Sequence, residues 1–228
     1  MPYVEVARSE SERGELVLRE RHGETGGPTV LELRANGVYV MDSAEHASEV
    51  ALADAALAAV ARPRRVLVGG LGLGFTLDRV LGDRRVEQCD VVEIEPALVD
   101  WMRDGTIPHG PRLLADDRAR VVVADVATAV AEAAPASYDV VLLDVDNGPG
   151  QLVHQGNAAL YREPFLVAVR ERLTPGGAVV IWSAAREPEL ADDLRTVFGE
   201  AEEHGHDVRL QDRDDRYWLY VGRRDPAG

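Results

Sequence analysis

Lysine is absent from this chain of 228 residues, so all 25 of its basic residues are arginines, which we interpret as a coding bias. Cysteine is nearly absent as well. The single Cys89 excludes an internal disulfide and indicates a reducing, cytoplasmic location. Because the sequence has no cluster of cysteines and histidines, we expect no metal site of that kind.

Long apolar runs are also lacking: none approaches the roughly 20 residues that a membrane-spanning helix needs. The first residues, Met1 to Glu5, do not read as a signal peptide. The 25 basic residues are outnumbered by 40 acidic ones. The formal net charge at pH 7 is −15, which on its own serves solubility. Since such a surface repels phosphates and attracts cations, we expect no nucleic-acid and no membrane partner, and a cationic substrate is permitted.

What the sequence does contain is a regular succession of short apolar and β-branched segments. In the first forty residues their alternation predicts strands, with a hairpin at Asn36-Gly37. These expected strands cover residues 3–8, 15–20, 29–34 and 37–41. Asp42-Ser43 then predicts the cap of an alanine-rich helix over residues 44–61.

From residue 64 onward, strand patterns alternate with helical ones. The expected strands cover residues 65–69, 90–94, 121–124, 138–143 and 178–182, and the expected helices cover residues 75–81, 97–103, 126–134, 158–173 and 188–198. This alternation predicts an α/β fold with a doubly wound, mostly parallel sheet. Residues 207–211 and 217–221 predict a C-terminal antiparallel hairpin. We therefore divide the chain into a β segment with one helix (1–62) and an α/β catalytic domain (63–228).

The segment VGGLGLGF (68–75) follows the first strand of the α/β part and begins a helix. Its glycines Gly70, Gly72 and Gly74 are spaced two apart, whereas a dinucleotide fingerprint needs a glycine where Phe75 stands. This spacing is common among folds that bind S-adenosylmethionine-type ligands, because glycine lets the backbone approach a nucleoside closely. The alternative is a tight strand-to-helix turn without a ligand.

Two acidic residues at later strand ends favour the ligand. Glu93 is placed to accept the two ribose hydroxyls, and Glu95 is the competing candidate. Asp125 is placed to accept a hydrogen bond from the amino group of an adenine, or alternatively to cap a helix. Because ligands of open α/β sheets bind at the carboxyl ends of the strands, we predict an adenosyl ligand there.

The expected strand at 138–143 leads into the segment LLDVDNGPG (142–150). Asp144, Asp146 and Asn147 either form a turn, for which these residue types are common, or belong to a site. The carboxyl end of this strand faces the same crevice as the glycines. We therefore favour a site beside the reactive end of the adenosyl ligand.

With these residues placed, the chain resembles the polyamine aminopropyltransferases, the family of spermidine and spermine synthases. The likeness is clearest in VLVGGLGLGF, VVEIEPALV, YDVVLLDVDNGPG and LYREPFLVAVRERLTPGGAVVIWS. The resemblance implies a Rossmann-like methyltransferase fold and decarboxylated S-adenosylmethionine as the donor. It also implies that Glu93 binds the ribose, that Asp125 contacts the adenine and that Asp144 is the catalytic aspartate.

The departures from the family pattern concern the amines. The glycine-loop aspartate, which in the family faces the aminopropyl amine, is Gly72 here. At the position of the family's second catalytic-loop acid this chain has Asn147, although Asp146 is adjacent. The family also has a Tyr-His-Glu triplet on the helix expected here over residues 44–61, and of that triplet only Glu49 remains. We predict Asp144 as the base, with Asp146, Asn147 and Glu49 as binders of the amine.

Tyr161 and Trp182 are candidate aromatic walls of the substrate site, and core packing is the alternative for Trp182. Three functions remain open. The first is an aminopropyltransferase that uses decarboxylated S-adenosylmethionine, and the second is a methyltransferase that uses intact S-adenosylmethionine. The third is a non-catalytic nucleoside-binding protein. The expected partner is a small-molecule amine, and a homodimer is left open.

Overall fold

The computed structural model describes residues 3–22, 29–150, 152, 154–210 and 213–226. Its first part is a four-stranded antiparallel sheet in the order β1-β2-β3-β4. The strands are β1 (Tyr3–Ser11), β2 (Gly14–Arg21), β3 (Val30–Ala35) and β4 (Val38–Asp42). Leucines at alternate positions, among them Leu16, Leu18 and Leu33, are buried on one face, as the sequence alternation predicts.

The second part is a seven-stranded sheet in the order β10-β11-β9-β8-β5-β6-β7. Its strands are β5 (Arg65–Gly69), β6 (Gln88–Glu93), β7 (Ala119–Val123), β8 (Tyr138–Leu143), β9 (Leu173–Ser183), β10 (Ala201–Leu210) and β11 (Arg213–Arg223). β5 to β9 pair in parallel, whereas β11 runs antiparallel to both β9 and β10. The predicted α/β class, the mostly parallel sheet and the terminal hairpin are confirmed.

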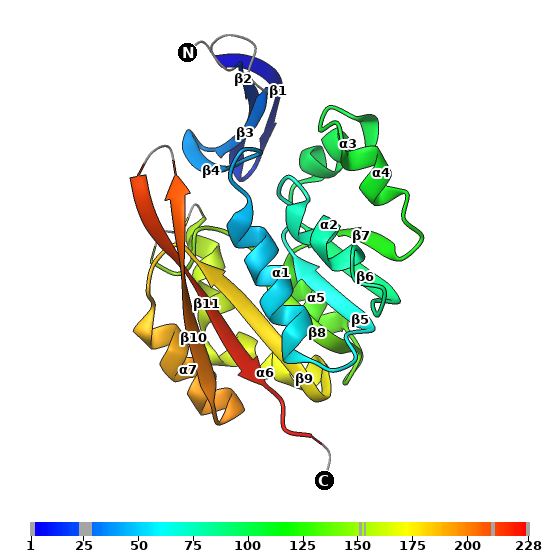
Figure 1. Cartoon of the computed structure of the whole chain (residues 1–228), viewed down its shortest axis with the longest axis vertical. Helices are drawn as coiled ribbons and strands as arrows, with labels where there is room; N and C mark the ends of the chain where they lie inside the picture. Colours follow the sequence, from blue (N-terminus) through cyan, green and yellow to red (C-terminus); the bar gives the residue numbers. More distant parts are fainter. Residues whose placement is uncertain (1–2, 23–28, 151, 153, 211–212, 227–228) are drawn as a thin grey trace.

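Helices cover both faces of this sheet. They are α1 (Ala47–Ala59), α2 (Phe75–Leu81), α3 (Pro96–Asp104), α4 (Gly110–Leu114), α5 (Val126–Glu132), the 3₁₀ helix η1 (Gln155–Tyr161), α6 (Glu163–Arg172) and α7 (Pro188–Phe198). Two apolar clusters follow the alternation along the strands: Val66 and Val68 pack with α1 to α4, whereas Leu67 packs with α5 to α7. The first cluster also includes the leucines of the four-stranded sheet, which lies at one end of the molecule (Figure 1).

Three expectations about helices need correction. The first helix begins at Ala47, because Asp42 accepts hydrogen bonds from the amides of Ala44 and Glu45 and thereby caps a turn before the helix. The helix expected over 158–173 is a 3₁₀ helix and an α-helix, separated at Arg162, which has an extended backbone and is the N-cap of α6; Pro164 lies in the first turn of α6. The short α4 was not predicted at all.

Within the described residues, no helix is long and apolar enough to cross a membrane. The helix α1 packs against α2, β8 and β9, so it covers the large sheet while the four-stranded sheet stands beyond it (Figure 1). The division of the chain at residues 62 and 63 stays a prediction.

Candidate active site

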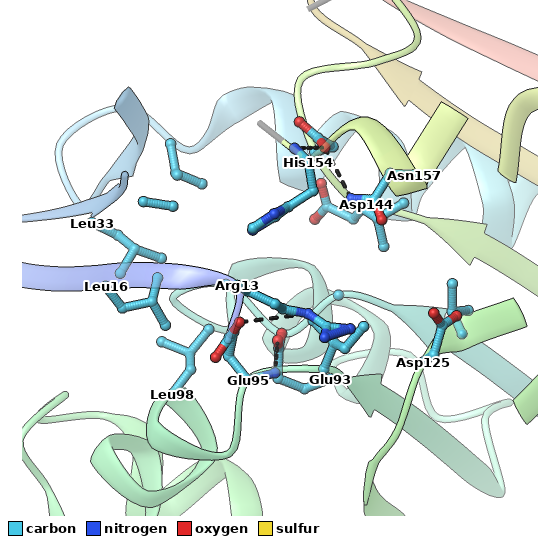
Figure 2. A pocket seen from close by; sticks show the side chains of 18 of the residues that line it. Arg13, Leu16, Leu33, Glu93, Glu95, Leu98, Asp125, Asp144, His154 and Asn157 are labelled. Carbon is cyan, nitrogen blue, oxygen red and sulfur yellow. Dashed lines mark hydrogen bonds and ion pairs between the residues drawn. The ribbon is translucent and has the colours of Figure 1, made fainter. Parts of the chain in front are cut away.

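Two cavities meet at the carboxyl ends of β5, β6 and β8. The first cavity (Figure 2) is lined from the large sheet by Gly70, Gly72, Glu93, Glu95, Asp125 and Asp144, and from the four-stranded sheet by residues that include Arg13, Leu16, Leu33 and Asn36. The second cavity is lined by residues that include Tyr39, Met41, Glu45, Glu49, Asn147, Trp182 and Tyr217. Val40, Gly72, Asp144 and Asp146 line both cavities and therefore mark the junction between them.

The glycine loop owes its shape to three residues with positive φ, which are Gly70 (94°), Gly72 (50°) and Gly74 (86°). A Cβ on Gly70 would lie 2.1 Å from the carbonyl oxygen of Asp144, so only glycine allows the loop to pack against β8. Gly70 and Gly72 line the first cavity, but Gly74 does not: it is the N-cap of α2 and packs against Met102. The loop is thus both a tight turn and a cavity wall.

Glu93 and Glu95 are distinguished by their partners. Glu93 is buried, and its carboxylate accepts hydrogen bonds from the amides of Leu71 (2.9 Å) and Glu95 (2.8 Å). Burial raises the pKa of Glu93 above its ordinary value, although these bonds oppose the shift. The side chain of Glu95 instead contacts Arg13 at 3.6 Å, across the cavity floor in Figure 2. Of the two acids, Glu93 is the one fixed beside the glycine loop.

Asp125 fulfils both roles that the sequence allowed. Its Oδ1 accepts a hydrogen bond from the amide of Ala127 (2.7 Å) and so caps α5. Its side chain also lines the first cavity, on the side away from the four-stranded sheet (Figure 2). The cap occupies one carboxylate oxygen, which leaves the other for a ligand.

Asp144 and Glu49 form an acidic pair at the junction. Asp144 follows β8, and its Oδ2 accepts a hydrogen bond of 2.6 Å from the hydroxyl of Thr76. Burial raises the pKa of Asp144 to about 6. Glu49, in the first turn of α1, is buried and accepts a hydrogen bond from Ser48. Its burial, and then the negative charge of Asp144, raise the pKa of Glu49 to about 7.

Asp146 holds the loop that follows β8. Its φ of 64° is unusual for a residue other than glycine. Its Oδ2 accepts hydrogen bonds from the amide of His154 (3.1 Å) and from the side chain of Asn157 (2.9 Å). Asn147 lines the second cavity and, through its carbonyl, accepts a bond from the amide of Ala184. Residues 149–157 begin here, and we predict that this polar stretch closes over the crevice as a gate when a ligand binds. Positions 151 and 153 lie outside the described residues.

The two predicted aromatic walls have different positions. Trp182 lines the second cavity, and its ring lies 4.9 Å from that of Tyr217. Tyr161 is buried, lines neither cavity, and donates its hydroxyl to the carbonyl of Val145. Its position therefore favours support of the loop after β8 over contact with a substrate.

Sequence reasoning missed several residues of the site. Tyr39 and Met41 lie on β4, and Tyr217 lies on β11, so each reaches the second cavity from an element that pattern alone assigns to packing. Thr76 follows the glycine loop directly, which was the available signal for it. Among the described residues, no group of three or more histidine, cysteine, aspartate or glutamate side chains is arranged to hold a metal ion.

Comparisons with known proteins identify a family for this chain. The family model described as "Spermine/spermidine synthase domain" matches residues 45–198. Putrescine N-methyltransferase 3 of Nicotiana tabacum is 34% identical over 125 residues, which are 54% of this chain and 31% of that protein. Polyamine aminopropyltransferase 2 of Pseudomonas aeruginosa is 33% identical over 160 residues, which cover 65% of this chain and 44% of that protein. The matched segments thus span less than half the length of these relatives.

Two solved structures have the same fold. A spermidine synthase in complex with the transition-state analogue AdoDATO has a TM-score of 0.80 at 18% identity, covering 98% of this chain and 74% of that one. The spermidine synthase of Thermotoga maritima has a TM-score of 0.78 at 17% identity, with the same coverage. At this level of identity the likeness shows the fold.

Proposed function

Because the chain belongs to the spermine/spermidine synthase family, we propose that it transfers an aminopropyl group from decarboxylated S-adenosylmethionine to a small amine. The observation that carries the proposal is the junction at Asp144 between two cavities of different character. One cavity offers a glycine loop with acids at strand ends, and the other offers carboxylates with aromatic rings.

The first cavity takes the donor. Glu93 accepts the two ribose hydroxyls, because each of its oxygens keeps acceptor capacity beyond the amide bonds that fix it. Asp125 accepts a hydrogen bond from the adenine amino group with the oxygen that does not cap α5. The main chain at Gly70 and Gly72 lies against the nucleoside and its tail. The sulfonium end then lies beside Asp144.

The second cavity takes the acceptor amine. Glu49, Asp146 and Asn147 offer oxygen atoms to an ammonium group, and none of the described residues that line this cavity is an arginine. Trp182 adds an aromatic face, which attracts a cation. A cation here also relieves the repulsion between Glu49 and Asp144, because it lies between two negative charges.

The reaction then needs positioning and one proton transfer. The amine nitrogen attacks the aminopropyl carbon, the carbon–sulfur bond breaks, and its electron pair stays on the sulfur of the leaving thioether. An alkylamine is mostly protonated at neutral pH, since its pKa is near the roughly 10.4 of lysine. Asp144 accepts the proton and thereby frees the lone pair. A pKa of about 6 suits this step, because the group is ionised at pH 7 yet basic enough to take a proton.

A second candidate is N-methylation of the amine with intact S-adenosylmethionine. It is favoured by Gly72, where the family pattern has an aspartate, and by Met41, whose uncharged side chain fills that space. Relatives named putrescine N-methyltransferase are consistent with this candidate. We further propose the cytoplasm as the location, on the strength of the single buried Cys89.

Mass spectrometry separates these functions. The protein is incubated with each donor and with putrescine, cadaverine or spermidine, and an acceptor that gains one aminopropyl unit supports the proposal. A methylated acceptor supports the second candidate instead. Asp144→Asn should lower turnover by roughly 10²–10⁴ while donor affinity is retained. A non-catalytic nucleoside-binding protein would show ligand stabilisation, about 2.7 kcal/mol at a hundred times the dissociation constant, without any product.

A further inference from the structure

Asp144 is attached to the glycine loop at more than one point. Its amide donates to the carbonyl of Gly69 (2.8 Å), and its own carbonyl packs so closely on Gly70 that a Cβ there would lie 2.1 Å away. The third attachment is through the side chain, from Thr76 in the first turn of α2. The carboxylate that faces the acceptor is thus fixed to the element that faces the donor.

The third attachment has a chemical consequence. Thr76 is only 2% exposed, and its single hydroxyl proton lies in a 2.6 Å bond to Oδ2 of Asp144, a length typical of a hydroxyl that donates to a carboxylate. No other side-chain hydrogen bond to Asp144 is found within the described residues. Oδ2 is therefore engaged with Thr76, and Oδ1 is the oxygen left for an amine.

The hydrogen bond from Thr76 opposes the effect of burial on Asp144. The titratable groups around Asp144 in the second cavity are Glu49 from α1, Glu45 before it, Asp146 from the following loop, Tyr39 from β4 and Tyr217 from β11. All are acids. The hydrogen bond from Thr76 lowers the pKa of Asp144 while burial raises it, so the hydroxyl favours the ionised base.

We propose that Thr76 is a positioning residue for the transfer reaction: it holds one oxygen of Asp144 so that the other receives the proton of the amine. The proposal rests on the proposed function, in which Asp144 is the base. It does not depend on which group the donor transfers, because an amine must lose a proton in aminopropyl and in methyl transfer alike.

The test compares Thr76→Val, which keeps the shape and removes the hydroxyl, with Thr76→Ser, which keeps the hydroxyl. A hydrogen bond to a charged group contributes about 1.5–3 kcal/mol, which corresponds to about one to two pKa units. In Thr76→Val the acidic limb of the turnover–pH profile should move up by about one to two pH units. Turnover at pH 7 should fall about two- to tenfold and recover at higher pH, with the donor's dissociation constant unchanged. Thr76→Ser should restore the wild-type profile.

A matched control lies at the beginning of β8, the strand that Asp144 follows. Thr174 donates to Asp139 at 3.0 Å, so Thr174→Val removes an equivalent threonine–aspartate bond far from the cavities. Thr174→Val should have the same pH dependence of turnover as the wild type. If the profile of Thr76→Val also coincides with the wild type, or if Ser fails to restore it, the proposal is wrong.

A second readout does not need activity. The carboxyl carbon of Asp144, assigned through Asp144→Asn, can be titrated by ¹³C NMR in wild type and in Thr76→Val. An upward shift of its titration in the variant supports the bond from Thr76 even if the protein transfers nothing to any amine, in which case the proposed function alone fails. Equal titration in both proteins overturns the proposal itself.

Discussion

Glu93 stabilises the glycine loop and also faces the ligand cavity. Its two amide partners, Leu71 and Glu95, hold it at the end of β6, so the carboxylate is fixed before any ligand binds. Glu95 lies two residues further on, at the N-cap of α3, and contacts Arg13 of the β1–β2 hairpin. The structure thereby separates Glu93, the acid that the sequence favours for the ribose, from its competing candidate Glu95.

This separation gives the first prediction. Glu93→Gln should weaken binding of the adenosyl thioether product by about 1.5–3 kcal/mol, because a charged acceptor of ribose hydroxyls is lost. Isothermal titration calorimetry measures the loss, and circular dichroism checks that the fold persists. Glu95→Gln is the control and should change the affinity less than threefold, or about 0.7 kcal/mol. Equal losses of affinity in the two variants would contradict the assignment of Glu93 as the acid that binds the ribose.

Gly72 gives the second prediction, in which Met41 has to be included. A Cβ at position 72 would lie 2.7 Å from the sulfur of Met41, so Gly72→Asp alone forces that side chain to move. The test is Gly72→Asp in a Met41→Ala background, compared with Met41→Ala by itself. The added aspartate should favour decarboxylated over intact S-adenosylmethionine by tenfold or more (about 1.4 kcal/mol), because it repels the carboxylate of the intact donor. An unaltered ratio of the two dissociation constants would mean that the donor tail does not lie beside Gly72.

The sequence predicts the acids of the site better than its other walls. Glu93, Asp125 and Asp144 were identifiable because parallel strands end at one edge of a sheet, which brings those side chains together. Tyr39 and Met41 were not, because they reach the cavity only through the way in which β4 docks on the glycine loop. Such contacts depend on packing between elements, and no local spacing encodes them.

At the scale of elements, regular strands and the Asp125 cap of α5 were predictable, whereas the start of α1 and the irregular segments were not. The first strand of the large sheet and its helix were found at their observed bounds, since a β-branched run followed by glycines is a strong local signal. The helix expected over 158–173 was wrong at residues 158–162, where a 3₁₀ helix continues the loop after β8. Hydrogen bonds from that region to Asp146 govern its shape, and they are not local.

The third prediction concerns this loop. Asp146 connects the end of β8 to His154 and Asn157, and all three residues line the first cavity. A bound thioether should therefore slow hydrogen exchange at the amides of residues 154–157, because a filled cavity stabilises the closed arrangement. Asp146→Ala should abolish most of this protection.

Helix α7 lines neither cavity, and its amides serve as the internal reference for the exchange experiment. They should exchange at the same rate with and without the thioether. If the amides of residues 154–157 also exchange at the same rate with and without the thioether, the segment does not act as a gate.

For the whole molecule, the net charge of −15 and the acidic second cavity have the same sign. The proposed donor and acceptor are both cations, so the field of the protein attracts the two molecules that must meet. The same acids disfavour folding when the cavity is empty. Glu49 and Asp144 are held near one another without an arginine among the described residues of the cavity lining.

The last prediction follows from this cost. In the folded chain the pKa of Glu49 is about 7 and that of Asp144 about 6, whereas in the unfolded chain they are about 4.3 and about 3.9. The folded state therefore binds more protons than the unfolded state between about pH 4 and pH 7. Because of these two groups, the free energy of unfolding should fall as the pH rises through that window. Glu49→Gln, which cannot ionise, should flatten the fall and make the ligand-free protein about 1–3 kcal/mol more stable at pH 8.

Glu32 provides the control for that measurement, because it is equally buried but lies 2.6 Å from Arg19 and 2.9 Å from Arg34. Glu32→Gln should destabilise the protein at pH 8, since it leaves two arginines without their charged partner. Urea unfolding at several pH values measures both variants. A saturating diamine should reverse the order for Glu49, because the ammonium group binds the ionised pair of the wild type and the variant offers it one charge fewer. If Glu49→Gln follows the wild-type stability curve at every pH, the pair at the junction does not hold a proton in the empty site.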